Sequence, residues 1–142
     1  MGLFTIGHGK TPFADIATVL KANGVEYLVD VRVAPFTNRN PEFNFYRLKV
    51  LCKESGLEYH HEGEALGGLW PRELVDERIE RMKSDPNDRA AIILAALAIA
   101  SDEYNVVLLC SETDHTKCHR YWWLSRYVET VLGRKVTHLH KA

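Results

Sequence analysis

Short strand-like segments alternate with helical segments along the whole chain. The clearest strand runs from Asn105 to Cys110, where four apolar residues follow one another without polar alternation. An uninterrupted apolar run of this length is typical of a strand buried on both faces of a parallel sheet. Strands that alternate with helices pair in parallel through right-handed crossovers. The sequence therefore predicts an α/β three-layer sandwich with a mostly parallel central sheet of about five strands flanked by helices.

Glycine, proline and asparagine mark the boundaries of these segments. The predicted strands are 3–6, 27–31, 57–60, 105–110 and 136–139. The predicted helices are 12–23, with Thr11 as its cap, 46–55, 71–83, 88–100 and 117–132. Two further segments, 36–45 and 62–68, are expected to be loops, and the first is long enough to be functional.

Composition and charge narrow the class of protein. The chain has 142 residues, of which 46% are hydrophobic and 26% charged, which is typical of one globular domain spanning residues 1–142. Its formal net charge of -1 gives no general attraction for polyanions, so an anionic partner needs a local basic cluster. Three cysteines without a signal-like start indicate reduced thiols in the cytoplasm. The longest apolar stretch, 90–100, is too short for a membrane span of about 20 residues.

Chemically reactive side chains follow four of the predicted strands. They are His8 and Lys10 after the first strand, Arg32 at the end of the second, His61 and Glu62 after the third, and Cys110, Ser111 and Glu112 after the fourth. The carboxyl ends of parallel strands meet at one edge, where α/β proteins bind their ligands. Lys10, Arg32 and nearby Arg120 are positively charged, so this edge is expected to bind a small anionic ligand or a nucleic-acid end.

Two cysteines are rival nucleophiles at this edge. Cys118 lies at the start of the last predicted helix, where amide donors and the neighbouring His119 favour a thiolate. Cys110 is either the last core residue of its strand or a thiol presented to the pocket. His8 and His119 are the acid/base candidates, and Glu112 would orient a partner.

Several residues are assigned to binding. Arg32 and Arg120 are expected to contact the anion together with Lys10, while Gly67 and Gly68 allow a ligand to approach the backbone. Asp30 shares a sheet face with Arg32, either orienting it for function or forming a structural ion pair.

Three other readings are tested by spacing. Gly9-Lys10-Thr11 lacks the earlier glycine of a phosphate loop, which excludes that motif. A zinc site from Cys110, His115, Cys118 and His119 is a minor alternative, because the usual paired cysteine spacing is absent, and no cofactor is expected. The pair Trp122-Trp123 is assigned to packing.

An ordered set of motifs resembles one family. The segments are Thr5-Ile6-Gly7-His8, Asp30-Val31-Arg32 with Pro35, Leu66-Gly67-Gly68, Leu109-Cys110 with Glu112, and Cys118-His119-Arg120. Together they resemble domain of unknown function 488 over nearly the whole chain, although Gly9 stands where that family commonly has serine. A weaker similarity to rhodanese-like domains lies in the Asp-Val-Arg strand and a cysteine that ends a later strand. The expected function is an enzyme acting on an anionic, nucleotide-related or nucleic-acid-related substrate. The alternatives are a non-catalytic anion-binding module or rhodanese-like sulfur transfer.

Overall fold

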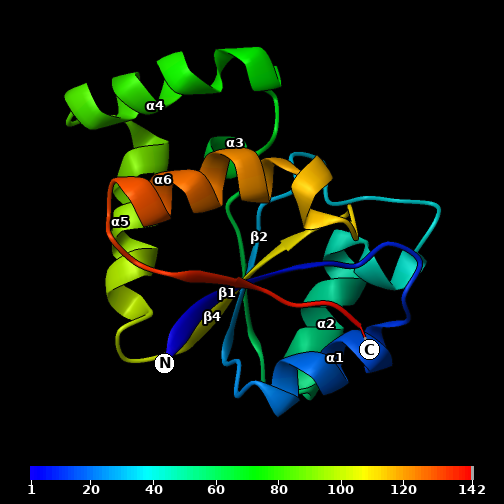
Figure 1. Ribbon diagram of the computed structural model, residues 1–142. Coiled ribbons are helices and arrows are strands. Elements are labelled where there is room, and N and C mark those ends of the chain that lie inside the picture. The colour runs from blue at the N-terminus through cyan, green and yellow to red at the C-terminus, as the bar shows by residue number, and fades with distance from the viewer. Residues whose placement is uncertain (142) are drawn as a thin grey trace.

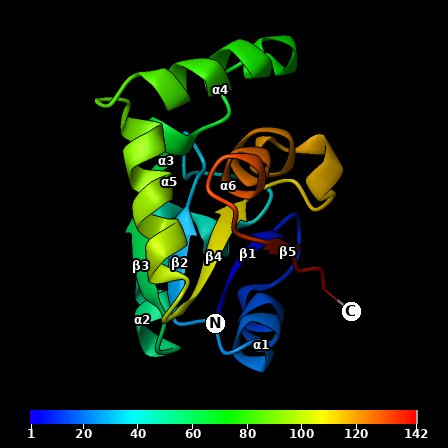
Figure 2. The same ribbon diagram turned by 60° about the vertical axis from the view of Figure 1, so that its left-hand side comes forward.

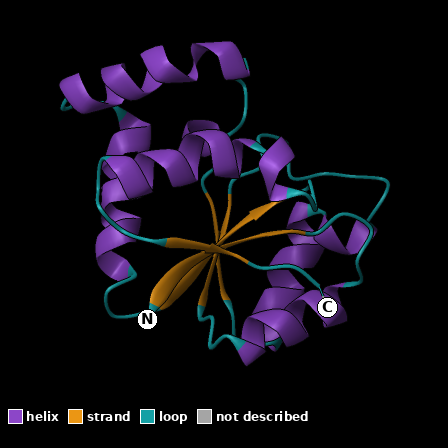
Figure 3. Cartoon of the chain, viewed as in Figure 1, coloured by secondary structure: helices purple, strands orange, loops and turns teal. Residues whose placement is uncertain are grey.

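Five strands form one sheet in which each hydrogen-bonded pair is parallel (Figures 1 and 3). The computed structural model describes residues 1–141. The strands are β1 Gly2–Gly7, β2 Tyr27–Asp30, β3 Glu58–His61, β4 Asn105–Cys110 and β5 Val136–His138, and their spatial order is β3-β2-β4-β1-β5. The predicted α/β fold with a sheet of about five strands is confirmed.

Helices cover both faces of the sheet and complete three layers (Figure 2). On one face lie α1 Phe13–Ala22 and α2 Phe45–Glu54, which pack against it together with the short 3-10 helix Pro41–Phe43. On the other face lie α3 Gly63–Leu66, α4 Val75–Ser84, α5 Arg89–Ala100 and α6 Arg126–Thr130. Each face therefore has its own hydrophobic core.

The central position of β4 explains its unbroken apolar sequence. Val106, Leu108 and Cys110 contribute to the core under α5 and α6. Val107 and Leu109 point the other way, into the core under α1 and α2. Successive side chains alternate between the two faces, and both faces of β4 are covered, so each position must be apolar. The same position places the end of β4 between β2 and β1.

The structure differs from the predicted segments mainly in the loops. The predicted loop 62–68 contains α3, and the predicted loop 36–45 contains the 3-10 helix Pro41–Phe43. The predicted helix 117–132 is divided into a 3-10 turn His115–Lys117, a π-helical segment Arg120–Ser125 and α6. Pro12, and not Thr11, is the N-cap of α1. Turns this short contain too few residues for a hydrophobic period to identify them.

No helix among residues 1–141 is both long and apolar enough to cross a membrane.

Candidate functional site

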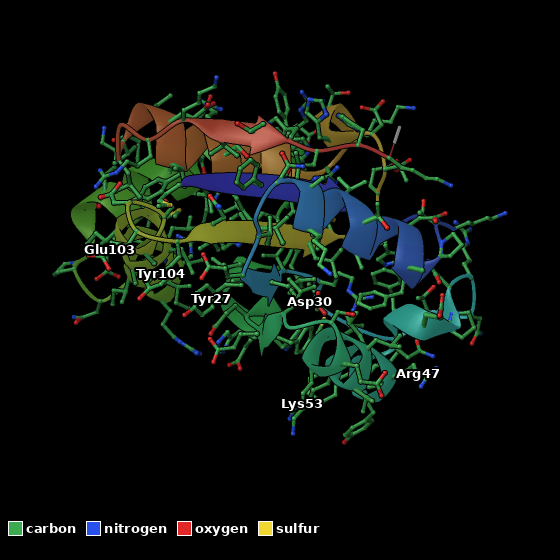
Figure 4. The ribbon with its side chains drawn as sticks, turned by 90° about the horizontal axis from the view of Figure 1, so that it is seen from below. Tyr27, Asp30, Arg47, Lys53, Glu103 and Tyr104 are labelled. Carbon is green, nitrogen blue, oxygen red and sulfur yellow. The ribbon has the colours of Figure 1, made fainter. Side chains whose placement is uncertain are left out.

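A cavity of about 800 Å³ opens at the carboxyl ends of β1, β2 and β4. Tyr27 and Asp30 mark the two ends of β2 in Figure 4, and the cavity lies at the Asp30 end. The predicted site residues that line the cavity are His8, Lys10, Arg32, Gly68, Cys110, Glu112, Cys118 and His119. Residues from distant parts of the chain meet here because β2, β4 and β1 are neighbours in the sheet.

A buried carboxylate holds the guanidinium of Arg32 in a fixed orientation. Arg32 Nε lies 2.8 Å from Asp30 Oδ1, and Arg32 Nη2 lies 2.6 Å from Asp30 Oδ2. Asp30 is fully buried, and the Tyr59 hydroxyl donates a further hydrogen bond of 2.6 Å to its Oδ2. A two-point contact of this kind fixes both the position and the plane of the guanidinium.

His8 holds the third nitrogen of the same guanidinium. Its Nδ1 lies 2.9 Å from the carbonyl oxygen of Gly9, so Nδ1 carries the proton and donates. Its Nε2 then accepts from Arg32 Nη1 at 3.2 Å. Burial is the main cause that lowers the pKa of His8, and the positive charge of Arg32 lowers it further. The ring therefore stays neutral. The ring also stacks on Phe43, with centroids 4.5 Å apart.

These contacts leave part of Arg32 free to bind a ligand. A guanidinium has five N–H groups, and Asp30 and His8 engage one on each of the three nitrogens. Each Nη therefore keeps one N–H, and Arg32 lines the cavity. Two parallel N–H groups match the oxygens of a carboxylate, sulfonate or phosphate.

Cys110 and Cys118 meet in the same cavity. Their Sγ atoms lie 2.7 Å apart, and His119 Nδ1 lies 3.5 Å from Cys118 Sγ and 4.0 Å from Cys110 Sγ. The hydrogen bond from Cys118, aided by His119, lowers the pKa of Cys110 far below its ordinary value despite burial. The same hydrogen bond, followed by burial, raises the pKa of Cys118. The directions of these two pKa shifts favour ionisation of Cys110 over ionisation of Cys118.

Gly68 determines where the His119 ring can lie. A Cβ atom at position 68 would come within 2.7 Å of His119 Nδ1 and 2.8 Å of its Cγ. Only glycine lets the backbone pass so close to this ring. A ligand was expected to approach the backbone of Gly68, and in the structure the ring of His119 lies there.

Two predicted site residues, Arg120 and Gly67, lie outside the cavity wall, and a third, Glu112, lines the cavity but bonds to its own loop. Arg120 is fully buried and lies outside the cavity wall, because its guanidinium donates to the hydroxyl of Thr5 and to the carbonyl oxygens of Glu112 and Thr113. Gly67 is also outside, packed against Val33. The Glu112 carboxylate accepts from the Asp114 backbone N–H at 3.0 Å and so stabilises the loop after β4.

Several cavity residues were not predicted. Phe36, Arg39, Lys117 and Trp122 line the wall, and Arg39 and Lys117 add positive charge beside Lys10. Trp122, predicted to serve packing, packs partly buried against the core and also lines the cavity, whereas Trp123 is 1% exposed and serves packing alone. Successive side chains of a helical segment point in different directions, so the adjacent indoles differ in burial.

The cluster of Cys110, Cys118 and His119 also has the residue types of a metal site. Among residues 1–141, Cys110, Cys118 and His119 form a group whose donor atoms all lie within 4.8 Å. His115, the fourth residue of the zinc alternative, instead stacks on His138 with centroids 4.2 Å apart. Two sulfurs on a tetrahedral zinc would be about 3.8 Å apart, given Zn–S bonds of about 2.3 Å. The observed 2.7 Å fits a direct interaction between the thiols better.

Fold and site together define an α/β domain with a two-cysteine, arginine-containing pocket at the ends of its parallel strands. Residues 13–127 match the family model described as Domain of unknown function DUF488. The chain belongs to this family, which confirms the resemblance seen in its motifs. Comparison with curated proteins and with solved structures found no significant match.

Proposed function

We propose that the protein is an enzyme that binds a small anionic substrate in this pocket and attacks it with the thiolate of Cys110. The observation that carries the proposal is that Cys110 and Arg32, at the ends of neighbouring strands, line the same cavity. Arg32 would fix the anion, and Cys110 would form the covalent bond.

The other residues have supporting roles. Asp30, Tyr59 and His8 keep Arg32 in place, so His8 acts as a positioning residue and not as a proton carrier. Exposed Lys10, Arg39 and Lys117 attract anions to the cavity mouth. His119, beside both sulfurs, is the group placed to accept or donate a proton. A cytoplasmic location, where thiols stay reduced, suits this chemistry.

The alternative is a non-catalytic module that binds a free anion, a nucleotide or the terminal phosphate of a nucleic acid. The oriented guanidinium of Arg32 supports it, because binding needs no thiolate. The two functions differ in what they require of Cys110, which makes its reactivity the deciding property.

Two alkylating reagents of similar size but different charge test the proposal. Iodoacetate is an anion and iodoacetamide is neutral, so the ratio of their rates at Cys110 reports both nucleophilicity and anion binding. We expect Cys110 to react at neutral pH with a preference for iodoacetate that free cysteine does not show. The Lys10→Ala/Lys117→Ala double variant should lower this preference, whereas Lys53→Ala, on α2 and outside the cavity wall, should leave it unchanged.

The outcome that contradicts the proposal is equally defined. If Cys110 reacts no faster than an ordinary thiol while inorganic phosphate still protects the cavity lysines from acylation, the pocket is a binding module. Cys52 provides the internal reference, because burial raises its pKa to about 12 and it lies under α2.

A further inference from the structure

The second cysteine of the pocket has no role in simple anion binding. Cys118 lines the cavity, is 4% exposed, and touches the sulfur of Cys110. The loop between the two residues is held in shape by Asp114, which accepts from the Thr116 backbone N–H at 3.1 Å, and by the carbonyl contacts of Arg120. The thiols are thus brought together by ordered structure.

The contact is suited to sulfur exchange. A thiol can attack only a sulfur that it can reach, and the two Sγ atoms, 2.7 Å apart, are already near the distance of about 2.05 Å of a disulfide bond. Cys52 cannot compete, because it is fully buried in the core on the opposite face of the sheet.

We propose that Cys118 is the resolving thiol of this site and that the substrate is a small oxyanion with an electrophilic sulfur as its reacting atom. This inference rests on the proposed function, since it needs the Cys110 thiolate to react first. A soft thiolate favours attack on sulfur, and the leaving oxyanion can remain against the free N–H groups of Arg32.

Thiosulfate is the simplest substrate of this class, and in the first step it reacts with Cys110. The Cys110 thiolate attacks the outer sulfur, a sulfur–sulfur bond forms, and the bond to the sulfonate group breaks. Sulfite leaves with the bonding electron pair, and Cys110 holds a persulfide. The charge of three is conserved, because one thiolate and one dianion become one persulfide anion and one dianion.

In the second step Cys118 resolves the persulfide. His119 takes the Cys118 proton, since its Nδ1 is 3.5 Å from that sulfur. Cys118 then attacks the sulfur of Cys110, the disulfide forms, and the outer sulfur leaves with its electron pair and takes up the proton as hydrosulfide. The two thiols are oxidised and the substrate sulfur is reduced. An external dithiol restores both thiols by exchange and becomes a disulfide itself.

The raised pKa of Cys118 agrees with this order of events. A thiol that stays protonated does not attack the substrate first, and it becomes a nucleophile only when a base is close. His119 is that base in the structure, and the missing side chain at Gly68 leaves room for its ring beside the thiols.

The test follows sulfur and thiols together in the full chain. The reduced protein is mixed with thiosulfate, quenched with an alkylating reagent, and examined by mass spectrometry, while sulfite and hydrosulfide are measured in solution. The wild type should release both products and gain a disulfide between Cys110 and Cys118. Cys118→Ser should release sulfite only and retain the extra sulfur on Cys110. Cys52→Ala, the matched control, should behave as wild type.

Each of the other outcomes contradicts one specific part of the proposal. A persulfide on Cys110 that persists in the wild type removes the resolving role of Cys118 and leaves the proposed function standing. No reaction with thiosulfate, at a Cys110 that still prefers iodoacetate, removes the substrate class. An unreactive Cys110 removes the proposed function itself. A stoichiometric metal that protects both cysteines in the purified protein also overturns the inference, and retained circular dichroism excludes misfolding of Cys118→Ser.

Discussion

Arg32 and Arg120 show how the same side chain has different roles in one site. Each nitrogen of both guanidinium groups makes one hydrogen bond, but Arg32 lines the cavity, whereas Arg120 donates to Thr5 and to the loop after β4 and lies outside the cavity wall. Sequence position suggests the same role for both, because each lies close to a strand end or a helix start. Both side chains are buried, so their tertiary hydrogen-bond partners separate them, and no local sequence pattern reports such contacts.

Replacement of Arg120 by methionine should destabilise the fold. The variant removes the donor to the buried hydroxyl of Thr5 and to two part-buried loop carbonyl oxygens, and a buried group left unsatisfied costs about 1–3 kcal/mol. Chemical denaturation should show a loss in this range or larger. Arg126→Met is the control, because Arg126 is 49% exposed and its ion pair with Asp76 should contribute at most about 1 kcal/mol. Equal stability of the two variants would contradict the structural role of Arg120.

At the scale of elements, the sequence patterns predicted the strands and the longer helices but not the short helical turns. The β4 strand was predicted with its observed bounds because its apolar run is continuous, and α5 was predicted to within one residue because a proline and an asparagine mark its start. Parallel topology alone brings His8, Arg32 and Cys110 to one cavity at the strand ends, whereas Gly67 and Arg120 lie outside it. The contact of Cys110 with Cys118 was beyond reach, because it depends on the shape of the loop between them.

Close contact between β1 and the loop after β4 predicts a sensitive glycine. A Cβ at Gly7 would lie 1.8 Å from the carbonyl oxygen of Glu112, so Gly7→Ala must displace this loop. Gly2→Ala, in the same strand, meets only the ring of Phe4 at 3.3 Å and should be tolerated. We expect Gly7→Ala to lower both the melting temperature and the alkylation rate of Cys110. If both variants match the wild type in the alkylation rate of Cys110 and in melting temperature, the close contact between Gly7 and Glu112 is contradicted.

The last helical segment predicts different roles for adjacent indoles. Trp123 is buried against Met82, so Trp123→Ala should cost about 3–5 kcal/mol of unfolding free energy. Trp122 is only half-buried and lines the cavity, so Trp122→Ala should lose less stability and mainly change the reactivity of Cys110. Denaturation curves of the two variants should be clearly separated. Similar losses in both would favour the sequence interpretation that both indoles serve packing.

At the scale of the whole molecule, buried histidines link stability to pH. Burial is the main cause that lowers the pKa of His8, His115 and His138, the last to about 4. In the unfolded chain these rings take up protons near their ordinary pKa of about 6.5. A histidine whose pKa is lowered in the folded state gives stability that is fully present above the pKa of the unfolded chain. This stability is lost as the pH falls toward the lowered pKa of the folded state. The folded state should therefore weaken between about pH 6.5 and 4.

Thermal unfolding across this pH range tests the linkage. We expect the melting temperature to fall with pH, and we expect a smaller fall for His138→Asn, which keeps an acceptor near Thr5 and removes the titrating ring. His60→Asn is the control, because His60 is 52% exposed. An identical pH profile for His138→Asn and the wild type would show that His138 does not contribute.

The most direct measurement for the central claim is the ionisation of Cys110 in the folded protein. The ultraviolet absorbance of the thiolate is followed against pH in the wild type, and the same titration of Cys110→Ser is subtracted. Because its pKa is lowered, the Cys110 thiol should be ionised throughout the neutral range, and the difference signal should disappear only well below pH 7. A difference signal that appears only near the ordinary thiol pKa of about 8.5 would contradict a reactive Cys110.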